Sequence, residues 1–304
     1  MKNTLFICLT LLLSATFAQA KPFKGEGKII GSLDGQVLAT GSGRVFMIDS
    51  KGQEVWSRKA GNNHDVWMLD NGNILYADGV IHEVNPKTDQ EVFTYTPKIL
   101  KGGGAYSCQR LENGNTLVGE NSSGKILELD PKGKVVFELQ TQPFKQNNHH
   151  NLRMVRKIKN GNYLACHSGA NLVREYTPKG EIVQEIKLNK LAFSAQRLEN
   201  GNTLIGNIDR IVEFTAEGDI AWECSNSDIE GVQLGKICGV NTLPNGNMVL
   251  GIYSIKKGEA GATFLEITRE KKLVWRYVQL PKGDRSAMSA QKLDNSGKAI
   301  SKLR

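Results

Sequence analysis

The sequence predicts an all-β protein, a β-propeller made of four-stranded antiparallel blades. Three observations lead to this architecture. One turn phrase recurs five times, its copies lie 40 to 47 residues apart, and no segment shows sustained helical periodicity. A four-stranded unit of about 40–50 residues is the repeat of a propeller blade. We expect six blades, with seven as the alternative.

The recurring phrase is Asn-Gly-Asn between two apolar residues. Asn-Gly between apolar runs is the strongest short signal for a hairpin, because both residues tolerate a positive φ. Each copy should therefore be a tight turn between the first and second strands of a blade. The copies are Leu69–Leu75, Leu111–Leu117, Ile158–Leu164, Leu198–Leu204 and Leu243–Val249. A degenerate copy, Leu33–Leu38, precedes them.

The third and fourth strands have their own repeated positions. The third strand ends in turns such as Asp130-Pro-Lys-Gly133, which suit type I geometry. It carries a glutamate in five units, and we assign these glutamates to contacts between blades or strands: Glu83, Glu128, Glu175, Glu213 and Glu266. The fourth strand carries a large residue, aromatic in five of six units, which predicts a packing slot between sheets: Trp56, Phe93, Phe137, Gln184, Trp222 and Trp275.

The chain divides into a signal peptide and one domain. Residues 1–20 have the basic Lys2, a short apolar run at 5–13 and an Ala-Gln-Ala cleavage signature, which are typical of a secretory signal. Residues 21–304 form a single propeller, with six full repeats over about 28–277 and a partial repeat over 284–304. The partial repeat either closes the ring beside the N-terminal strand or completes a seventh blade with residues 21–27. We expect a periplasmic or secreted monomer without a membrane span.

The charge and the cysteines of the chain limit the binding partners and the disulfides that we expect. The net charge of +8 is spread along the chain without a long basic run, so nucleic acid is not an expected partner. Four cysteines follow the signal peptide, and none forms a C-x-x-C pair: Cys108, Cys166, Cys224 and Cys238. Cys224 and Cys238 flank one loop and could form a disulfide in an oxidising compartment; free buried thiols are the alternative.

Hairpin geometry places a candidate site at one rim. Because the Asn-Gly turns gather at one end of the channel, first strands start and second strands end at the other. The position five residues before each turn phrase should line that mouth: Lys28, His64, Tyr106, Arg153, Phe193 and Cys238. The second strands end at Asp78, Glu120-Asn121, His167, Asn207 and Tyr253, and an adjoining loop adds His149 and His150. Four histidines thus meet at one rim, while His82 lies on a third strand outside it.

These side chains suit several chemistries. We predict His64 and His150 as catalytic candidates, with Asp65 or Asp78 fixing the tautomer of His64. Arg153 with Lys28 suits a sulfate or carboxylate group. The predicted ligand-binding residues are Asp78, Tyr106, Glu120, His149, Arg153, His167, Asn207 and Tyr253.

A metal site has less support. His64, His150 and His167 with Glu120 match the ligand count of zinc. However, the sequence contains no H-x-H or H-x-x-x-H spacing, and these ligands would come from separate blades. We therefore assign no metal ligands and leave a divalent metal open.

The phrases Ser194–Asn207 and His64–Leu75 resemble the repeats of arylsulfotransferase-like and quinoprotein (PQQ)-like β-propellers. The resemblance covers nearly all of the chain after residue 20 and implies the propeller fold. Arylsulfotransferases of this type use a central histidine that is transiently sulfated, and the resemblance implies His64 for that role. Tyr106, Phe193 and Cys238 depart from it, because they stand where further histidines or arginines would be expected. Quinoprotein dehydrogenases carry a vicinal cysteine disulfide, which this sequence lacks, so PQQ is not expected and the cofactor stays open.

Two functions remain open from the sequence. The first is an exported propeller that binds a small molecule or glycan, or a protein partner, through its histidine-rich rim. The alternative is a histidine-centred enzyme, either arylsulfotransferase-like or a glycan lyase or hydrolase. A hydrolase with paired carboxylates would need two facing acids, and Asp78 with Glu120 is the candidate pair.

Overall fold

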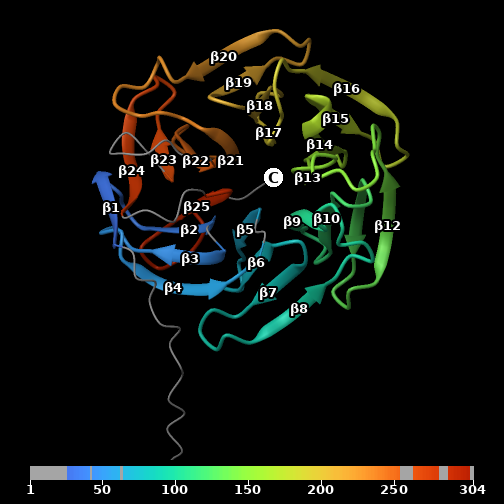
Figure 1. Cartoon of the computed structure of the whole chain (residues 1–304), viewed down its shortest axis with the longest axis horizontal. Coiled ribbons are helices and arrows are strands. Elements are labelled where there is room, and N and C mark those ends of the chain that lie inside the picture. Colours follow the sequence, from blue (N-terminus) through green and yellow to red (C-terminus); the bar gives the residue numbers. More distant parts are fainter. Residues whose placement is uncertain (1–25, 42, 62–63, 254–262, 281–286, 302–304) are drawn as a thin grey trace, which may run out of the picture.

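The computed structural model describes residues 26–41, 43–61, 64–253, 263–280 and 287–301. Six antiparallel sheets surround a central axis, which confirms the six-bladed propeller (Figure 1). Across these ranges the one helical element is a single turn, η1 (Ser168–Ala170), and no helix is long and apolar enough to cross a membrane. The predicted signal peptide lies outside the described residues.

Blades 2 to 5 follow the chain, each from its innermost to its outermost strand. Blade 2 comprises β5 (Asp65–Met68), β6 (Ile74–Ala77), β7 (Ile81–Val84) and β8 (Glu91–Tyr95). Blade 3 comprises β9 (Ala105–Arg110), β10 (Thr116–Glu120), β11 (Lys125–Leu129) and β12 (Val135–Gln140). Blade 4 comprises β13 (Val155–Lys157), β14 (Tyr163–His167), β15 (Leu172–Tyr176) and β16 (Ile182–Lys187). Blade 5 comprises β17 (Ser194–Arg197), β18 (Thr203–Gly206), β19 (Arg210–Phe214) and β20 (Ile220–Ser225).

The two ends of the chain close the ring by joining each other's blades. Blade 1 has the C-terminal strand at its centre: β25 (Ser289–Leu293), then β2 (Gln36–Gly41), β3 (Arg44–Ile48) and β4 (Glu54–Lys59). Blade 6 has the N-terminal strand at its outer edge: β21 (Lys236–Thr242), β22 (Met248–Tyr253), β23 (Phe264–Ile267), β24 (Leu273–Leu280) and then β1 (Glu26–Gly31). The partial repeat therefore closes the ring and does not build a seventh blade.

This closure corrects the predicted position of Lys28. Lys28 lies on β1 opposite Val278, exposed at the outer edge of blade 6, and not at the channel. The channel position of blade 1 belongs to Met288, which stands five residues before Leu293, the same offset as in the other blades. The physical reason is that Ser289–Leu293 carries the first-strand pattern and pairs with β2, whereas residues 26–31 pair with the outer strand β24.

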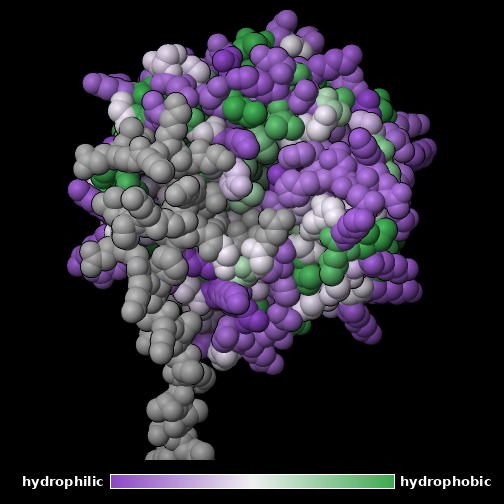
Figure 2. All heavy atoms as spheres, in the orientation of Figure 1, coloured by the Kyte–Doolittle hydropathy of each residue, from purple (hydrophilic) through white to green (hydrophobic). Residues whose placement is uncertain are grey.

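Hydrophobic clusters fill the spaces between blades, and the fourth-strand aromatics contribute to them as predicted. Trp275 is fully buried, and Trp56, Phe93 and Trp222 pack against clusters that combine neighbouring blades. Gln184, the exception, donates through its side-chain amide to the Ala216 carbonyl 3.0 Å away. On the face drawn in Figure 2, the described surface is largely hydrophilic, and its hydrophobic side chains form separate patches.

The Asn-Gly rim repeats one turn geometry. In each turn the glycine has φ between +81° and +88°, and no asparagine of the phrase has a positive φ. The apolar residue that opens the phrase accepts a hydrogen bond from the glycine, as in Gly72 N to Leu69 O at 2.9 Å. The turns are thus three-residue loops with one left-handed glycine, a common hairpin class, and not the two-residue type that needs two positive φ angles.

The third-strand glutamates link neighbouring blades, which confirms their predicted role. Four of them accept a hydrogen bond from the second asparagine of their own turn phrase, for example Asn202 Nδ2 to Glu213 Oε1 at 2.7 Å. All five also pair with a basic residue of the next blade: Glu83 with Arg110, Glu128 with Lys157, Glu175 with Arg197, Glu213 with Arg269, and Glu266 with Lys292.

The junction between blades 1 and 2 replaces both partners of this pair. Met47 occupies the glutamate position of blade 1, opposite Trp56, and Met68 occupies the basic position of blade 2. Both belong to the apolar cluster between the two blades. An ion pair has been exchanged for an apolar pair, so neither side leaves an unpaired charge.

All four described cysteines are free and buried, and Cys224 and Cys238 are not bonded. Burial raises the pKa of the thiols of Cys166 and Cys238 to about 12. They are therefore protonated and unreactive at neutral pH.

Candidate functional site

The mouth opposite the Asn-Gly rim is a ring to which each blade contributes one side chain. In ring order from blade 1 these are Met288, His64, Tyr106, Arg153, Phe193 and Cys238. The ring has two halves. Blades 2 to 4 contribute the polar half, whereas Phe193, Cys238 and Met288 form one apolar cluster.

Arg153 is the centre of the polar half. Its Nη1 lies 3.0 Å from His64 Nδ1, and its Nη2 lies 3.2 Å from His149 Nε2. The guanidinium also lies over the rings of Tyr106 and Phe193, with its carbon 5.1 Å and 5.8 Å from their centroids. No carboxylate in the described part of the chain pairs with it. Burial therefore lowers the pKa of Arg153, although the guanidinium stays charged.

The hydrogen bonds of Arg153 fix the tautomer of His149. Arginine only donates, so His149 Nε2 must be an acceptor. A ring nitrogen of His64 must accept as well; Arg153 Nη1 lies 3.0 Å from its Nδ1 and 3.4 Å from its Nε2. His149 then carries its proton on Nδ1 and donates it to the Tyr106 hydroxyl oxygen, and that hydroxyl donates to the Gly102 carbonyl 3.2 Å away. Both histidines are neutral in this arrangement.

The pKa values agree with neutral histidines. Burial, followed by the charge of Arg153, holds the pKa of His64 well below its usual value and lowers that of His149 to about 4. His150 stacks edge-on against His149 at a centroid distance of 5.0 Å. Burial, Arg153 and then Lys236 lower the pKa of His150 as well. At pH 7 the mouth thus holds two fixed cations, Arg153 and Lys236, among three neutral imidazoles.

Two buried asparagines hold the loop that carries His149 and His150. Asn121 donates to the carbonyls of Gly102 and Asn148 at 2.7 and 2.9 Å, and its Oδ1 accepts from the Asn151 amide at 2.9 Å. Asn151 donates back to the Asn121 carbonyl at 3.0 Å. The repeat spacing places Asn121 at this rim, but no sequence pattern indicates its positioning role or that of Asn151.

A glycine seats Tyr106 beneath this loop. A Cβ atom on Gly103, where φ is +118°, would lie 1.7 Å from the Tyr106 hydroxyl oxygen. The run Gly102-Gly-Gly104 was the sequence signal for this close approach.

Several predicted ligand-binding residues are engaged within their own or an adjoining blade. Glu120 is buried and accepts from the hydroxyls of Tyr95 and Ser123, both at 2.5 Å. His167 is buried against the Tyr176 hydroxyl at 2.8 Å, and burial lowers its pKa to about 3. Asn207 accepts from the backbone of its neighbour Ile208. Tyr253 lies at the mouth, where Lys236 Nζ is 5.3 Å from its ring centroid.

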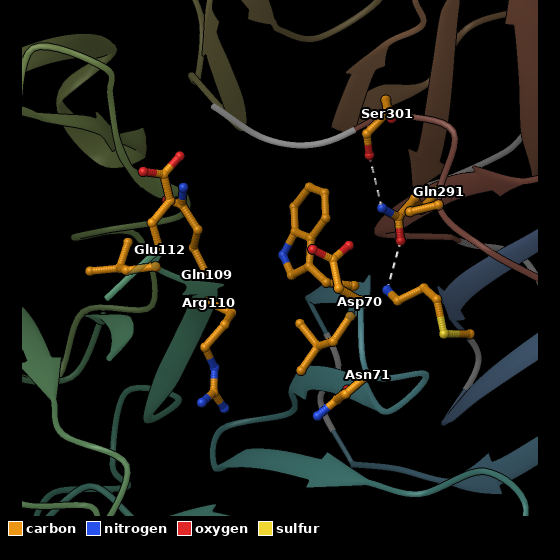
Figure 3. A pocket seen from close by; sticks show the side chains of 12 residues that line it. Asp70, Asn71, Gln109, Arg110, Glu112, Gln291 and Ser301 are labelled. Carbon is orange, nitrogen blue, oxygen red and sulfur yellow. Dashed lines mark hydrogen bonds between the residues drawn. The ribbon is translucent and has the colours of Figure 1, made fainter. Parts of the chain in front are cut away.

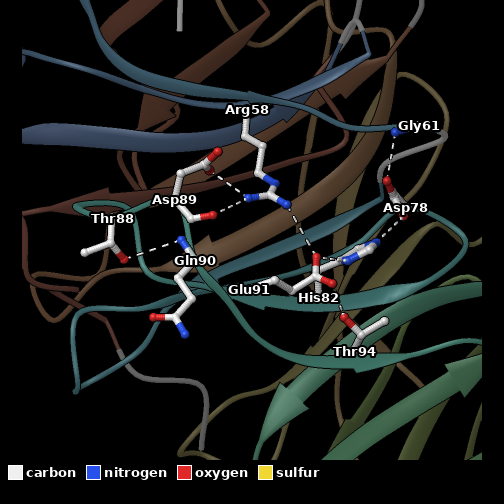
Figure 4. A network of polar contacts seen from close by, with 9 residues as sticks. All are labelled: Arg58, Gly61, Asp78, His82, Thr88, Asp89, Gln90, Glu91 and Thr94. Carbon is white, nitrogen blue, oxygen red and sulfur yellow. Dashed lines mark hydrogen bonds and ion pairs between the residues drawn. The ribbon is translucent and has the colours of Figure 1, made fainter. Parts of the chain in front are cut away.

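Neither predicted carboxylate fixes the ring of His64. Asp78 faces outward, where it accepts from Gly61 N at 2.8 Å and contacts His82 Nε2 at 3.2 Å; Figure 4 shows this network. Asp65 is buried deeper in the channel. It forms a two-armed pair with Arg156, at 2.8 and 3.0 Å, and accepts from Cys108 N at 3.1 Å. Arg153 takes the orienting role that we had assigned to an aspartate.

The structure does not bring together the four candidate zinc ligands, nor the two candidate catalytic acids. His167 and Glu120 point to other partners than His64 and His150, and Asp78 pairs with His82 instead of facing Glu120. Among the residues that the structure describes, no group of three histidine, cysteine, aspartate or glutamate side chains is placed to hold a metal ion.

The comparison with known proteins identifies the fold. The sequence matches no family model and no curated protein. A Bacteroides caccae protein of unknown function, solved by crystallography, is similar with a TM-score of 0.73 and 24% identity, over 85% of this chain and 98% of that one.

Two lyases are similar at lower identity. A streptogramin B lyase structure has a TM-score of 0.56 and 13% identity, over 86% of this chain and 90% of that one. A virginiamycin B lyase from Staphylococcus aureus, in a catalytically inactive histidine-to-alanine form with quinupristin, has a TM-score of 0.55 and 12% identity, over 84% and 89% of the two chains. At these identities the likeness establishes the β-propeller architecture and leaves activity to the site itself.

Proposed function

We propose that this protein is an exported propeller that binds a carboxylate- or sulfate-bearing small molecule or glycan at the mouth around Arg153. The observation that carries the proposal is the enclosed guanidinium of Arg153, which has imidazole and aromatic neighbours but no carboxylate partner among the residues that the structure describes. An enclosed charge without a counter-ion is costly, and an anionic ligand removes that cost.

The electrostatics of the mouth support an anion in particular. Lys236 adds a second cation close enough to lower the pKa of His150. The planar guanidinium presents paired N–H groups that match a carboxylate or sulfate. Beside them, Phe193, Cys238 and Met288 offer an apolar wall for the uncharged part of the ligand.

The binding test compares ligands that differ in charge. A galacturonate tetrasaccharide and a sulfated chondroitin tetrasaccharide should raise the melting temperature of the protein, whereas neutral cellotetraose should not, because ligands that bind the folded state stabilise it. Arg153→Gln should weaken anion binding at least about tenfold, since it removes a charge-assisted contact. Arg58→Gln is the matched control, because Arg58 already pairs with Asp89 and Glu91 on the outer edge. Equal binding by the two variants would refute the proposal.

A second candidate function is elimination chemistry on such an anion, as in a uronate lyase. It is favoured by His149, which is exposed, neutral, and oriented by Tyr106 and Arg153. Arg153 Nη2 would turn from His149 to the carboxylate and neutralise it, which frees His149 Nε2 to accept the adjacent carbon-bound proton. The C–O bond to the leaving sugar would then break as the C=C bond forms, and the leaving oxygen would take up the proton from the His149 imidazolium.

Turnover separates binding from catalysis. The lyase function predicts an unsaturated uronate product, detectable by its ultraviolet absorbance, that His149→Ala abolishes and His82→Ala preserves. Sulfuryl transfer through His64, implied by the family resemblance, predicts instead a sulfated His64 after incubation with an aryl sulfate, detectable by mass spectrometry. Binding without either product leaves the ligand-binding function alone.

A further inference from the structure

A second hollow lies at the opposite rim, beside the Asn-Gly turns of blades 2 and 3. It is a cavity of about 450 Å³, lined by Trp67, Asp70, Gln109–Glu112, Gln291 and Ser301. Figure 3 shows Glu112, Gln109 and Arg110 along one side of it and Gln291 with Ser301 along the other. A neighbouring hollow of about 360 Å³ shares the wall at 109–112. Neither hollow contains any residue of the His64–Arg153 mouth.

The cavity lies where a repeated contact is missing. Two residues before each turn phrase, three blades carry a glutamine whose Oε1 accepts from a backbone N–H of the next blade. Gln109 accepts from Lys157 at 2.9 Å, Gln196 from Thr242 at 3.2 Å, and Gln291 from Met68 at 2.7 Å. Gln109 also donates its Nε2 to the Lys157 carbonyl at 3.4 Å, so its amide pairs with both backbone groups of that residue.

Blade 2 has Trp67 at this position, and its indole cannot make the contact. The equivalent backbone groups on blade 3 are the N–H and C=O of Arg110. Leu111 N donates to Asn115 O, so the next residue pair, Arg110 and Thr116, is a non-hydrogen-bonded pair whose backbone groups point away from β10. No hydrogen bond to these two groups of Arg110 exists within the described residues. Trp67 is itself buried, and its indole nitrogen also has no partner in this part of the chain.

We propose that this cavity binds the acetamido group of an N-acetylamino sugar. The acetamide takes the place of the missing glutamine amide: its carbonyl accepts from Arg110 N–H and its N–H donates to Arg110 C=O. The proposal is independent of the anion site at the other mouth.

The surroundings favour an isolated amide over an extended peptide. The next inward-facing amide of β9, Cys108 N–H, already donates to Asp65, so a peptide strand would find no ladder to continue. Leu69 and Leu111 give apolar contact for the methyl group and the sugar ring. The exposed carboxylate of Glu112 can accept hydroxyl hydrogens at the rim.

Two further junctions lack the glutamine and provide comparisons within the molecule. Blade 6 carries Asn241 at this position, and its side-chain amide donates to the Ala290 carbonyl of blade 1 at 3.2 Å. Blade 4 carries Arg156 there, and Asp65 engages it in the channel. The backbone that it would bridge belongs to Arg197, which lines neither of the two hollows. At Arg110, the backbone that lacks its glutamine contact also lines the cavity.

The test is a titration followed by backbone amide NMR. Chitobiose, the dimer of N-acetylglucosamine, should shift the Arg110 amide signal and leave that of Lys157 unmoved, because the Lys157 N–H is already bonded to Gln109. Cellobiose, which has the same linkage without acetamido groups, should shift neither. Equal shifts with both sugars, or none with chitobiose, would overturn the proposal, and so would binding of trialanine but not of chitobiose.

A variant tests the same proposal without the need to assign NMR signals to residues. Trp67→Gln restores the residue that three other blades use, so the new amide should fill the vacancy and weaken chitobiose binding at least about tenfold. Trp222→Phe, on an outer strand, is the control for loss of a tryptophan and should bind as the parent does. Unchanged binding by a folded Trp67→Gln protein would refute the proposal. If Trp67→Gln does not fold, the Arg110 shift in the unaltered protein decides.

Discussion

The two ends of the channel follow opposite rules. At the Asn-Gly rim, five glutamates each meet a basic residue of the next blade. At the other mouth, Arg153 meets only imidazole, phenol and apolar groups among the described side chains. The first end repeats around the ring, whereas the second differs from blade to blade.

The difference separates contacts that stabilise the fold from a cation that suits an anionic ligand. A contact that recurs at five of the six junctions fastens blade to blade, and a ligand has no reason to prefer one copy. A cation that appears once, and that no carboxylate of the described ranges pairs with, contributes nothing to the repeat and raises the free energy of the empty site. The comparison therefore predicts that substitutions at the two ends have opposite effects on stability.

The largest expected effect is at the repeated end. Glu266 is buried and contacts Asn247, Trp275 and Lys292 at 2.7 to 2.8 Å. Glu266→Gln leaves Lys292 without its counter-ion, and we expect it to lower the free energy of unfolding by about 3 kcal/mol. Urea denaturation measures this, with the exposed Glu217→Gln as control. A loss below that of the control would show that the repeated pairs are not what joins the blades.

The junction between blades 1 and 2, which has two methionines in place of the ion pair, provides a second test of how the blades are joined. Met68→Arg places an unpaired charge against an apolar cluster and should cost about 2 kcal/mol. Met47→Glu supplies the glutamate found in the other blades, so the double variant should recover at least about 1 kcal/mol of that loss. A double-mutant cycle in urea measures the coupling energy. Additive losses would mean that this junction cannot adopt the ion pair of its neighbours.

The repeats explain why so much was predictable from the sequence. The Asn-Gly phrases fix the height of every residue along the channel, and the offset of five residues correctly placed His64, Tyr106, Arg153, Phe193 and Cys238. It failed for Lys28 because the ends of a ring have no neighbour in sequence, so pairing decides which end supplies the inner strand.

The direction in which a side chain points was harder to predict than its height along the channel. Asp78, Glu120 and His167 stand at the predicted level, but their side chains turn to His82, Tyr95 and Tyr176 within their own or adjoining sheets. A residue at the end of a strand can face the channel or the neighbouring blade, and the choice depends on partners that sequence spacing does not specify. Arg153 was assigned to the ligand, but its orienting contact with two histidines depended on the loop that Asn121 holds.

At the irregular mouth, loss of charge should not destabilise the protein. Arg153→Gln removes an enclosed cation that no carboxylate of the described chain pairs with, so the free energy of unfolding should stay the same or rise by up to about 1 kcal/mol. Urea denaturation without added anions measures it, alongside Glu266→Gln. A loss of about 2 kcal/mol or more would make Arg153 a structural residue and remove the main support for an anion site.

Acid should act through the buried histidines, with a smaller effect. The pKa values of His64, His149 and His167 are lowered in the folded protein, so between about pH 6.5 and pH 4 the unfolded chain binds more protons than the native one. Stability should therefore fall as the pH is lowered through this window. His82, whose pKa is raised by Asp78 and Glu91 against the effect of burial, opposes the trend. Urea denaturation at pH 7 and pH 4.5 should show a smaller loss for His167→Gln than for the parent protein, and a larger loss for His82→Gln. An equal loss in all three proteins would place the acid sensitivity outside these histidines.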